Sequence, residues 1–147
     1  LEFDRDVWLK AIEIKPGNPN VVHHVLLSNA HELQKSPISD RMISPKGDNF
    51  IAVSTGKKQT MAYPEGTGIF IQKGTKITAQ LHYTPYGTAT EDITQIGFYL
   101  LDEAPDIVFR SHNTHNTTFK IPAYAKDVKF IAEEKIDKDF KRVLTLV

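Results

Sequence analysis

The stretch Val21-Val22-His23-His24-Val25-Leu26-Leu27 places two adjacent histidines inside an apolar run rich in β-branched residues. A run of this length and composition predicts a strand that is buried on both faces. Imidazoles buried there without partners would cost roughly a few kcal/mol each. Neutral imidazole is also the commonest metal ligand that proteins offer. The rest of the chain must therefore supply either hydrogen-bond partners or further metal ligands.

The sequence around this run predicts mostly strands. Residues 7–14 alternate around Trp8 and end at the turn cluster 15–20, and residues 76–84 alternate cleanly. Further strands are expected at 49–55, 68–72, 94–101, 107–111, 117–121, 128–132 and 142–147. Residues 28–48 read as a long polar loop with one helical turn at 30–34, and residues 56–67 as a turn-rich connection. About nine or ten short strands predict an all-β protein, an antiparallel β-sandwich of jelly-roll type.

Length and composition bound the class of protein. A chain of 147 residues suits one domain, 1–147, with a sizeable core. Its 18 basic and 18 acidic residues are dispersed, which argues against nucleic acid and against a membrane surface as partners. No apolar stretch reaches the length of a membrane span. The absence of cysteine excludes disulfides and thiolate metal sites. Because the chain opens on Leu1 and closes on the apolar run 143–147, we expect a piece excised from a longer protein.

His82 is the strongest candidate for a third ligand. Successive side chains of a strand point to opposite faces, so Gln80 and His82 share one face of the strand 76–84. By the same rule His23 and His24 diverge, and one ion can hold both only at a bulge, a twist or a sheet edge. The alternative is one core histidine with a hydrogen-bond partner and one histidine that faces solvent. Taken alone, His82 is also typical of an ordinary half-buried histidine.

Together His23, His24 and His82 would form an all-imidazole site. Such ligation suits copper, zinc, nickel or iron, and three ligands leave positions open for water or substrate. Copper heads the affinity order, but residue types alone do not separate copper from zinc. Gln80 is placed to hydrogen-bond a ligand ring or a bound water. His112 and His115 are the alternative ligands if a turn brings them together, and His31 is expected in solvent.

Two motifs resemble those of a known family. Pro16-Gly17-Asn18 followed by Val21-Val22-His23-His24-Val25-Leu26 is similar to the first histidine motif of the copper type II, ascorbate-dependent monooxygenases. Gln80-Leu81-His82-Tyr83-Thr84-Pro85-Tyr86-Gly87 resembles the second, His-Tyr motif in its bacterial-type branch. The spacing of 58 residues from His24 to His82 fits that family as well. The resemblance covers roughly residues 7–101.

The resemblance implies a tandem pair of jelly-roll domains with one copper ion each. It assigns His23, His24 and His82 as the ligands of the first, electron-storing copper, with Gln80 and Tyr83 supporting them. A second copper-binding domain, expected beyond Val147, would activate dioxygen and hydroxylate a C–H bond. A small-molecule reductant and a periplasmic or secreted location are implied too.

The chain also departs from the family pattern. It holds no His-x-His pair, and Met42 and Met61, its only methionines, lie in unmatched contexts. This domain alone is therefore expected to be inactive. Two other interpretations stay open. One is a metal-free jelly-roll interaction or ligand-binding module with a structural histidine pair, and the other is a zinc site in the same histidines.

Overall fold

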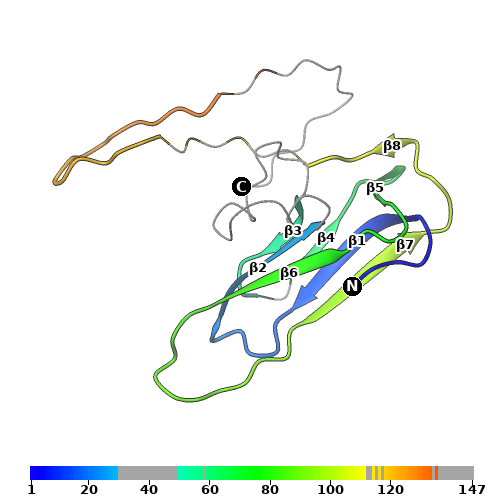
Figure 1. Cartoon of the computed structure of the whole chain (residues 1–147), viewed down its shortest axis with the longest axis horizontal. Coiled ribbons are helices and arrows are strands. Elements are labelled where there is room, and N and C mark those ends of the chain that lie inside the picture. The colour runs from blue at the N-terminus through cyan, green and yellow to red at the C-terminus, as the bar shows by residue number, and fades with distance from the viewer. Residues whose placement is uncertain are drawn as a thin grey trace. The chain divides into compact units, whose positions relative to one another are not determined.

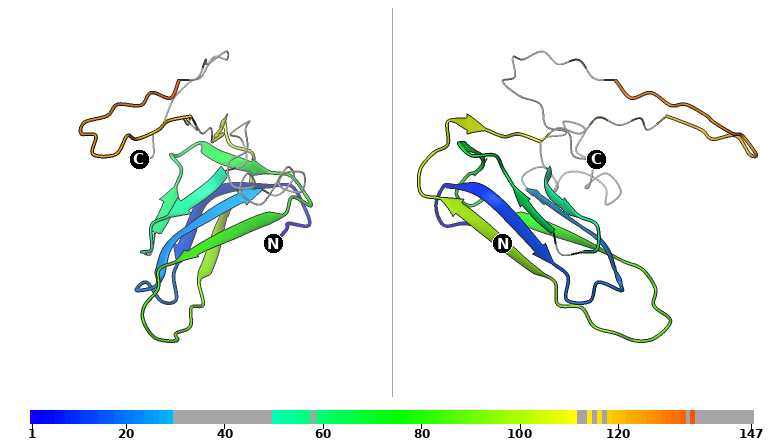
Figure 2. Two further views of the ribbon diagram at one scale, coloured as in Figure 1. Left: turned by 60° about the vertical axis from the view of Figure 1, so that its left-hand side comes forward. Right: turned by 180° about the vertical axis from the view of Figure 1, so that it is seen from behind.

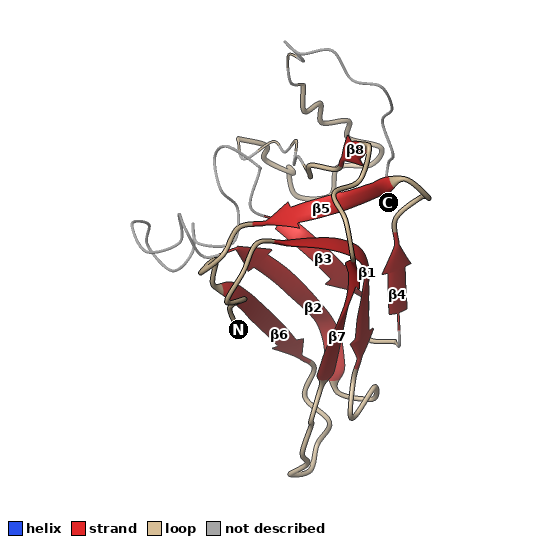
Figure 3. Ribbon diagram, turned by 90° about the vertical axis from the view of Figure 1, so that its right-hand side faces the viewer, coloured by secondary structure: helices blue, strands red, loops and turns tan. Residues whose placement is uncertain are grey.

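The computed structural model describes residues 1–29, 50–57, 59–111, 114, 116, 118–133 and 135 (Figure 1). The chain divides into two compact units, Leu1–Asn113 and Thr114–Val147. The described residues form eight strands and no helix (Figure 3), so the predicted all-β class is confirmed. All eight strands belong to the first unit, and that unit carries the candidate site.

The larger sheet is built around β1 (Val7–Lys15). One edge of β1 pairs with β7 (Gln95–Leu101), and the other is shared by β5 (Thr67–Ile71) and β4 (Gln59–Ala62). These contacts are antiparallel, whereas β8 (Ile107–Val108) pairs in parallel with β5. The expected antiparallel arrangement therefore holds with this one short exception.

The smaller sheet has β2 (Val22–Asn29) in its centre. It is flanked by β3 (Phe50–Ser54) on one edge and β6 (Ile77–Tyr83) on the other, both antiparallel to it. This register brings the histidine run beside the strand of the second motif, although the two are distant in sequence. The pairing of β2 with β6 therefore creates the candidate site.

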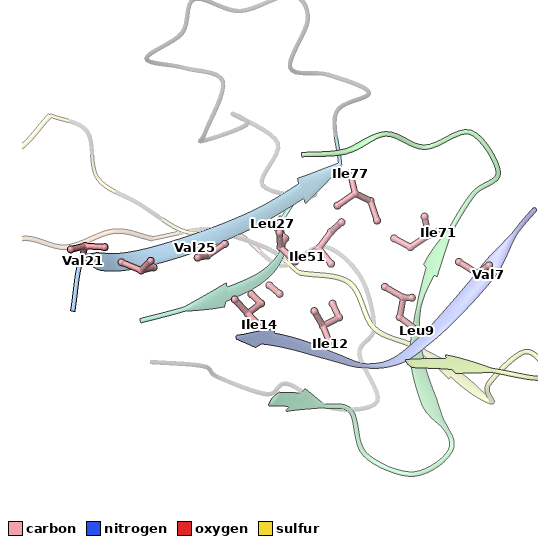
Figure 4. Packing of buried hydrophobic residues seen from close by; sticks show 12 residues of the cluster. Val7, Leu9, Ile12, Ile14, Val21, Val25, Leu27, Ile51, Ile71 and Ile77 are labelled. Atoms are coloured by element: carbon pink, nitrogen blue, oxygen red, sulfur yellow. The ribbon is translucent and has the colours of Figure 1, made fainter. Parts of the chain in front are cut away.

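A single apolar core joins the two sheets (Figure 4). Leu9 and Ile12 of β1 and Val25 and Leu27 of β2 are almost fully buried in it. Full burial of such a side chain contributes about 1.5–3 kcal/mol relative to exposure, so this cluster supplies most of the driving force for folding. The other buried members of the cluster are Val7, Ile14, Val21, Val22, Ile51, Ala52, Ile71 and Ile77.

Two connections pass from one sheet to the other at the same end of the strands. The turn 16–21 leads from β1 to β2, and the loop 84–94 leads from β6 to β7 (Figure 2). Because β2 begins and β6 ends there, both connections adjoin the histidines.

Several sequence expectations need correction. β4 lies in the segment 56–67 that was expected to be a turn-rich connection, where its four residues are mostly exposed. The described residues of the expected strands 117–121 and 128–132 form no strand. They are extended, but no described neighbouring segment forms a backbone ladder with them. The expected helical turn at 30–34 and the strand at 142–147 lie outside the described residues.

The second unit contains two extended arms joined by a turn. The turn is closed by a hydrogen bond from the Ala125 backbone N–H to the Pro122 carbonyl, 3.1 Å long. The Phe119 and Phe130 rings meet across the arms with centroids 5.0 Å apart. Among the described residues of this unit, the two arms are joined by side-chain contacts and not by a backbone ladder.

Candidate metal centre

A β-bulge in β2 positions the histidine pair. In the pairing of β2 with β6, Val22 lies opposite Tyr83 and His24 lies opposite His82, so His23 is an extra residue on β2. Val22, Val25 and Leu27 all face the core, which strict alternation would forbid. The bulge therefore leaves both histidines off the core face, and the predicted burial of this strand on both faces is wrong, since His23 is exposed and His24 half-buried.

The three imidazole rings form one cluster with His24 in the middle. His23 Nδ1 and His24 Nδ1 are 2.7 Å apart, and the two ring centroids are 4.9 Å apart. On its other side the His24 ring lies against that of His82, with centroids 4.0 Å apart and planes inclined by 45°. The three histidines named from the sequence therefore lie together in the structure. Their role as ligands stays a prediction.

The surroundings of His24 favour its neutral form. Partial burial lowers the pKa of His24 below its usual value of 6.5, and the neighbouring His82 and His23 lower it further. A neutral ring keeps a nitrogen lone pair available, which a metal ion requires. Near pH 7 the middle residue of the cluster is therefore in the form that binds metal.

Gln80 lies two residues before His82 on β6, opposite Leu26. Its side-chain oxygen is buried and has no hydrogen-bond partner in the described part of the chain. An unsatisfied buried acceptor costs about 1–3 kcal/mol, so such atoms usually mark a missing donor. An imidazole N–H or a metal-bound water would satisfy it, as expected for the residue that supports His82.

Asp92, in the loop between β6 and β7, accepts several hydrogen bonds from residues near the start of β2, the end of β6 and the start of β7. Its Oδ1 accepts from the Asn18 backbone N–H at 2.8 Å, and its Oδ2 accepts from the Tyr83 hydroxyl at 3.1 Å and the Thr94 hydroxyl at 2.8 Å. Desolvation raises the pKa of Asp92, but these bonds and one from the Gly17 backbone outweigh it and hold the pKa below its usual value. Tyr83, which follows His82 in the chain, is thus hydrogen-bonded to a carboxylate, and its own pKa is raised by desolvation and by Asp92.

Two glycines permit close backbone approach around the bulge. A Cβ at Gly17 would lie 2.6 Å from the backbone N and O of Ile93, so only glycine lets the β1–β2 turn contact the β6–β7 loop. Gly56 has φ +72°, and a Cβ there would overlap Val22 O and lie 3.1 Å from His23 O. The backbone of the bulge is therefore packed against the turn that follows β3.

The rings are not arranged as a finished metal site. Across the residues that the structure describes, no group of three or more His, Asp or Glu side chains is arranged to hold a metal ion. Two nitrogens on one tetrahedral ion, each at about 2.0–2.1 Å, lie about 3.3 Å apart. The His23–His24 separation of 2.7 Å would have to widen, and the stacked His82 ring would have to turn a nitrogen toward them. His23 and His82 are exposed, and exposed side chains change rotamer on the ps–ns timescale.

The structure does not test the remaining sequence candidates. His31, His112 and His115 lie outside the described residues. A separate pocket of about 200 Å³ lies at the other end of β2, lined by Asn29, Phe109 and Arg110 among others. The side-chain oxygen of Asn29 is buried without a partner among the described residues.

Sequence reasoning missed Asp92 and the role of Asn18. The two residues are 74 positions apart, and a carboxylate in a polar loop has no local signature that separates it from a solvated one. In the sequence, Pro16-Gly17-Asn18 indicates only a turn and part of a motif. The signal for the bulge was present, however, because Val22, Val25 and Leu27 break the period of two.

The site therefore belongs to an all-β protein with a three-histidine cluster on the smaller sheet, where β2 begins and β6 ends. Comparisons with protein-family models, curated proteins and solved structures found no match to this chain. The resemblance of the two histidine motifs to the copper monooxygenases accordingly stays a prediction. No helix in the described ranges is long and apolar enough to cross a membrane.

Proposed function

We propose that this chain is a copper-binding β-sandwich in which His23, His24 and His82 hold one copper ion. The bulge at His23 carries the proposal, because it puts two adjacent histidines on the side of the strand where His82 lies. A regular strand would separate them. The neutral state favoured for His24 and the unsatisfied oxygen of Gln80 support the same interpretation.

A set of three ligands favours an open, reactive site over a closed, structural one. When bound, copper would supply one-electron chemistry by cycling between its two oxidation states, and a site with three imidazoles leaves a position open. The side chains of this chain would bind and orient the ion at the sheet surface. Partial exposure of the histidines leaves the site accessible to a small-molecule reductant.

The motif resemblance extends this proposal to a larger protein. In the larger protein, this chain would be the electron-transfer domain of a copper-dependent monooxygenase, and it would have jelly-roll topology. The protein would act in the periplasm or outside the cell. The oxygen-activating copper would belong to a second domain C-terminal to Val147. The chain by itself would bind copper but hydroxylate nothing.

A copper titration under oxidising and reducing conditions tests the proposal, with His82→Ala beside the wild type. We expect one tightly bound equivalent in the wild type and at least a 100-fold weaker affinity in the variant, since loss even of a supporting contact costs about 10–100-fold. Competition with zinc identifies the preferred metal. Equal copper affinity of both proteins would remove His82 from the site, and no binding by the wild type would overturn the proposal.

A second candidate function is a metal-free interaction or ligand-binding module. The 2.7 Å contact between His23 and His24 favours it, because one ring donating to the other satisfies the pair without a metal. The pocket beside Arg110 and Asn29 would then be the place to search for a ligand. Thermal unfolding separates the two functions: a ligand in large excess over its Kd stabilises the folded state, by about 2.7 kcal/mol at a 100-fold excess. Copper should have no such effect on a metal-free module.

A further inference from the structure

We propose that Asp92 is the positioning residue of the three-histidine site, because its carboxylate joins the start of β2 to the end of β6. This inference rests on the proposed function, since it concerns the geometry of the same cluster. Asp92 accepts its hydrogen bonds from Asn18, Tyr83, Thr94 and the Gly17 backbone, and none of these residues is a histidine. It acts through the two backbone segments that carry them.

The first arm of Asp92 reaches the start of β2. Its Oδ1 accepts the Asn18 backbone N–H at 2.8 Å, and the Asn18 carbonyl in turn accepts the N–H groups of Val21 and Val22, each at 3.2 Å. The carboxylate is therefore linked through one residue to the backbone that immediately precedes His23. Because bonds to an ionised acceptor are stronger than neutral ones, this arm is a firm anchor.

The second arm reaches the end of β6. Oδ2 accepts the hydroxyl of Tyr83 at 3.1 Å, and Tyr83 directly follows His82. Tyr83 is also the residue paired with Val22, on the far side of the bulge from the His24–His82 pair. The Thr84 backbone N–H continues the connection by donating to the Val21 carbonyl at 2.8 Å. Both arms thus end at the boundary of the bulge.

The bulge is the part of the ladder that needs such support. His23 has no partner residue on β6, so regular pairing does not hold its backbone. The close approach of Gly17 to Ile93 brings the loop of Asp92 against the turn before β2. Loss of the carboxylate would leave the bonds from Asn18 Nδ2 to Thr90 Oγ1 and to the Glu91 carbonyl to join this loop to the turn, and we expect the three rings to diverge.

The chain offers a matched control at its other end. Asp6 Oδ1 accepts the Lys73 backbone N–H at 2.7 Å and so ties the start of β1 to the turn before β6. Asp6 and Asp92 are both loop aspartates that accept a backbone N–H across a long stretch of sequence. Only Asp92 bonds to segments that adjoin the histidines in the chain, since Tyr83 directly follows His82. A general effect of losing such a bond on the fold would appear in both variants.

The test compares Asp92→Ala, Asp92→Asn and Asp6→Ala with the wild type. Copper affinity in both oxidation states, the electron paramagnetic resonance spectrum of bound Cu(II) and thermal unfolding are measured for each protein. We expect Asp92→Ala to weaken copper binding about 10–100-fold and to alter the Cu(II) spectrum. Asp92→Asn keeps the shape of the side chain, so its copper affinity should lie between those of Asp92→Ala and the wild type. Asp6→Ala should lose stability without any change in affinity or spectrum.

Each outcome bears on one claim. If the wild type binds copper and both Asp92 variants match it in affinity and spectrum, Asp92 has no positioning role while the proposed function stands. Equal changes in Asp92→Ala and Asp6→Ala would likewise reduce Asp92 to a general structural contact. If Asp92→Ala fails to fold, Asp92→Asn decides by the same criteria. A wild type that binds no copper overturns the proposed function and this inference with it.

Discussion

The two faces of β2 differ in role: one packs in the core, and the other carries the candidate ligands. On the core face Val22, Val25 and Leu27 are buried among residues of both sheets, while on the other face His23 and His24 are exposed or half-buried. A single extra residue separates these roles, because the bulge lets the core face keep its apolar side chains and places two consecutive histidines together. Changes on the core face should therefore alter stability, and changes on the outer face should alter metal binding.

The largest effect is expected on the core face. Leu27 is fully buried, so Leu27→Ala should lower the free energy of unfolding by about 2–5 kcal/mol, through lost burial and the cavity left behind. Chemical denaturation measures this loss. Copper affinity of the folded variant should stay at the wild-type level. A variant that weakens copper binding as strongly as it weakens the fold would show that the two faces are not separable.

Deletion of His23 sharpens the comparison from the other side. Without this residue Val22, Val25 and Leu27 would alternate regularly toward the core, so the sheet should still form. Copper affinity should fall by at least about 100-fold, because one ligand is lost and the bulge with it. Circular dichroism together with a copper titration reads out both properties. Retained wild-type affinity would contradict the role given to the bulge.

Gly56 tests the packing beneath the bulge with a smaller change. Its φ of +72° and its contact with the carbonyls of Val22 and His23 leave no room for a Cβ. Gly56→Ala should therefore destabilise the fold by more than about 1 kcal/mol. Gly74 also has φ +72°, but a Cβ there would meet nothing within 4 Å, so Gly74→Ala is the matched control for strain alone. A copper affinity lowered only in Gly56→Ala would show that the contact, and not the dihedral angle, shapes the site.

The smallest effect concerns acid stability. The pKa of Asp92 is lower in the folded protein than its usual value of 3.8, so the folded state favours the ionised carboxylate. This contribution to stability is present above the unfolded pKa and is lost as the pH falls through the folded pKa. Unfolding of the metal-free protein between pH 5 and pH 2 should therefore be less pH-dependent in Asp92→Asn. An unchanged slope would mean that the carboxylate is not held as described.

Local pattern predicted most of the strands of the first unit, because each pairs one apolar face with the core. The alternation of Ile77, Ala79 and Leu81 also placed Gln80 and His82 together on the opposite face, in agreement with the register. Three errors have physical causes. Gln59–Ala62 has few buried side chains, so the sequence of this strand shows no apolar pattern from which to predict it. Residues 118–121 and 128–130 alternate, but alternation cannot supply a neighbouring strand.

The third error was the interpretation of residues 21–27 as a strand buried on both faces. The apolar residues are continuous there, yet the spacing of Val22, Val25 and Leu27 contains the bulge, and Leu26 and His24 are only half-buried. The candidate ligands were predictable because they lie in two short motifs. Asp92 was not, because its contacts with Asn18 and Tyr83 exist only once the two sheets have come together.

The central claim is that His23, His24 and His82 share one copper ion. X-ray absorption spectroscopy at the copper edge, on the loaded wild type and on His82→Ala, tests it most directly. The account predicts three imidazole ligands in the wild type and two in the variant. Identical ligation in the two proteins, or copper bound only through oxygen atoms, would contradict it.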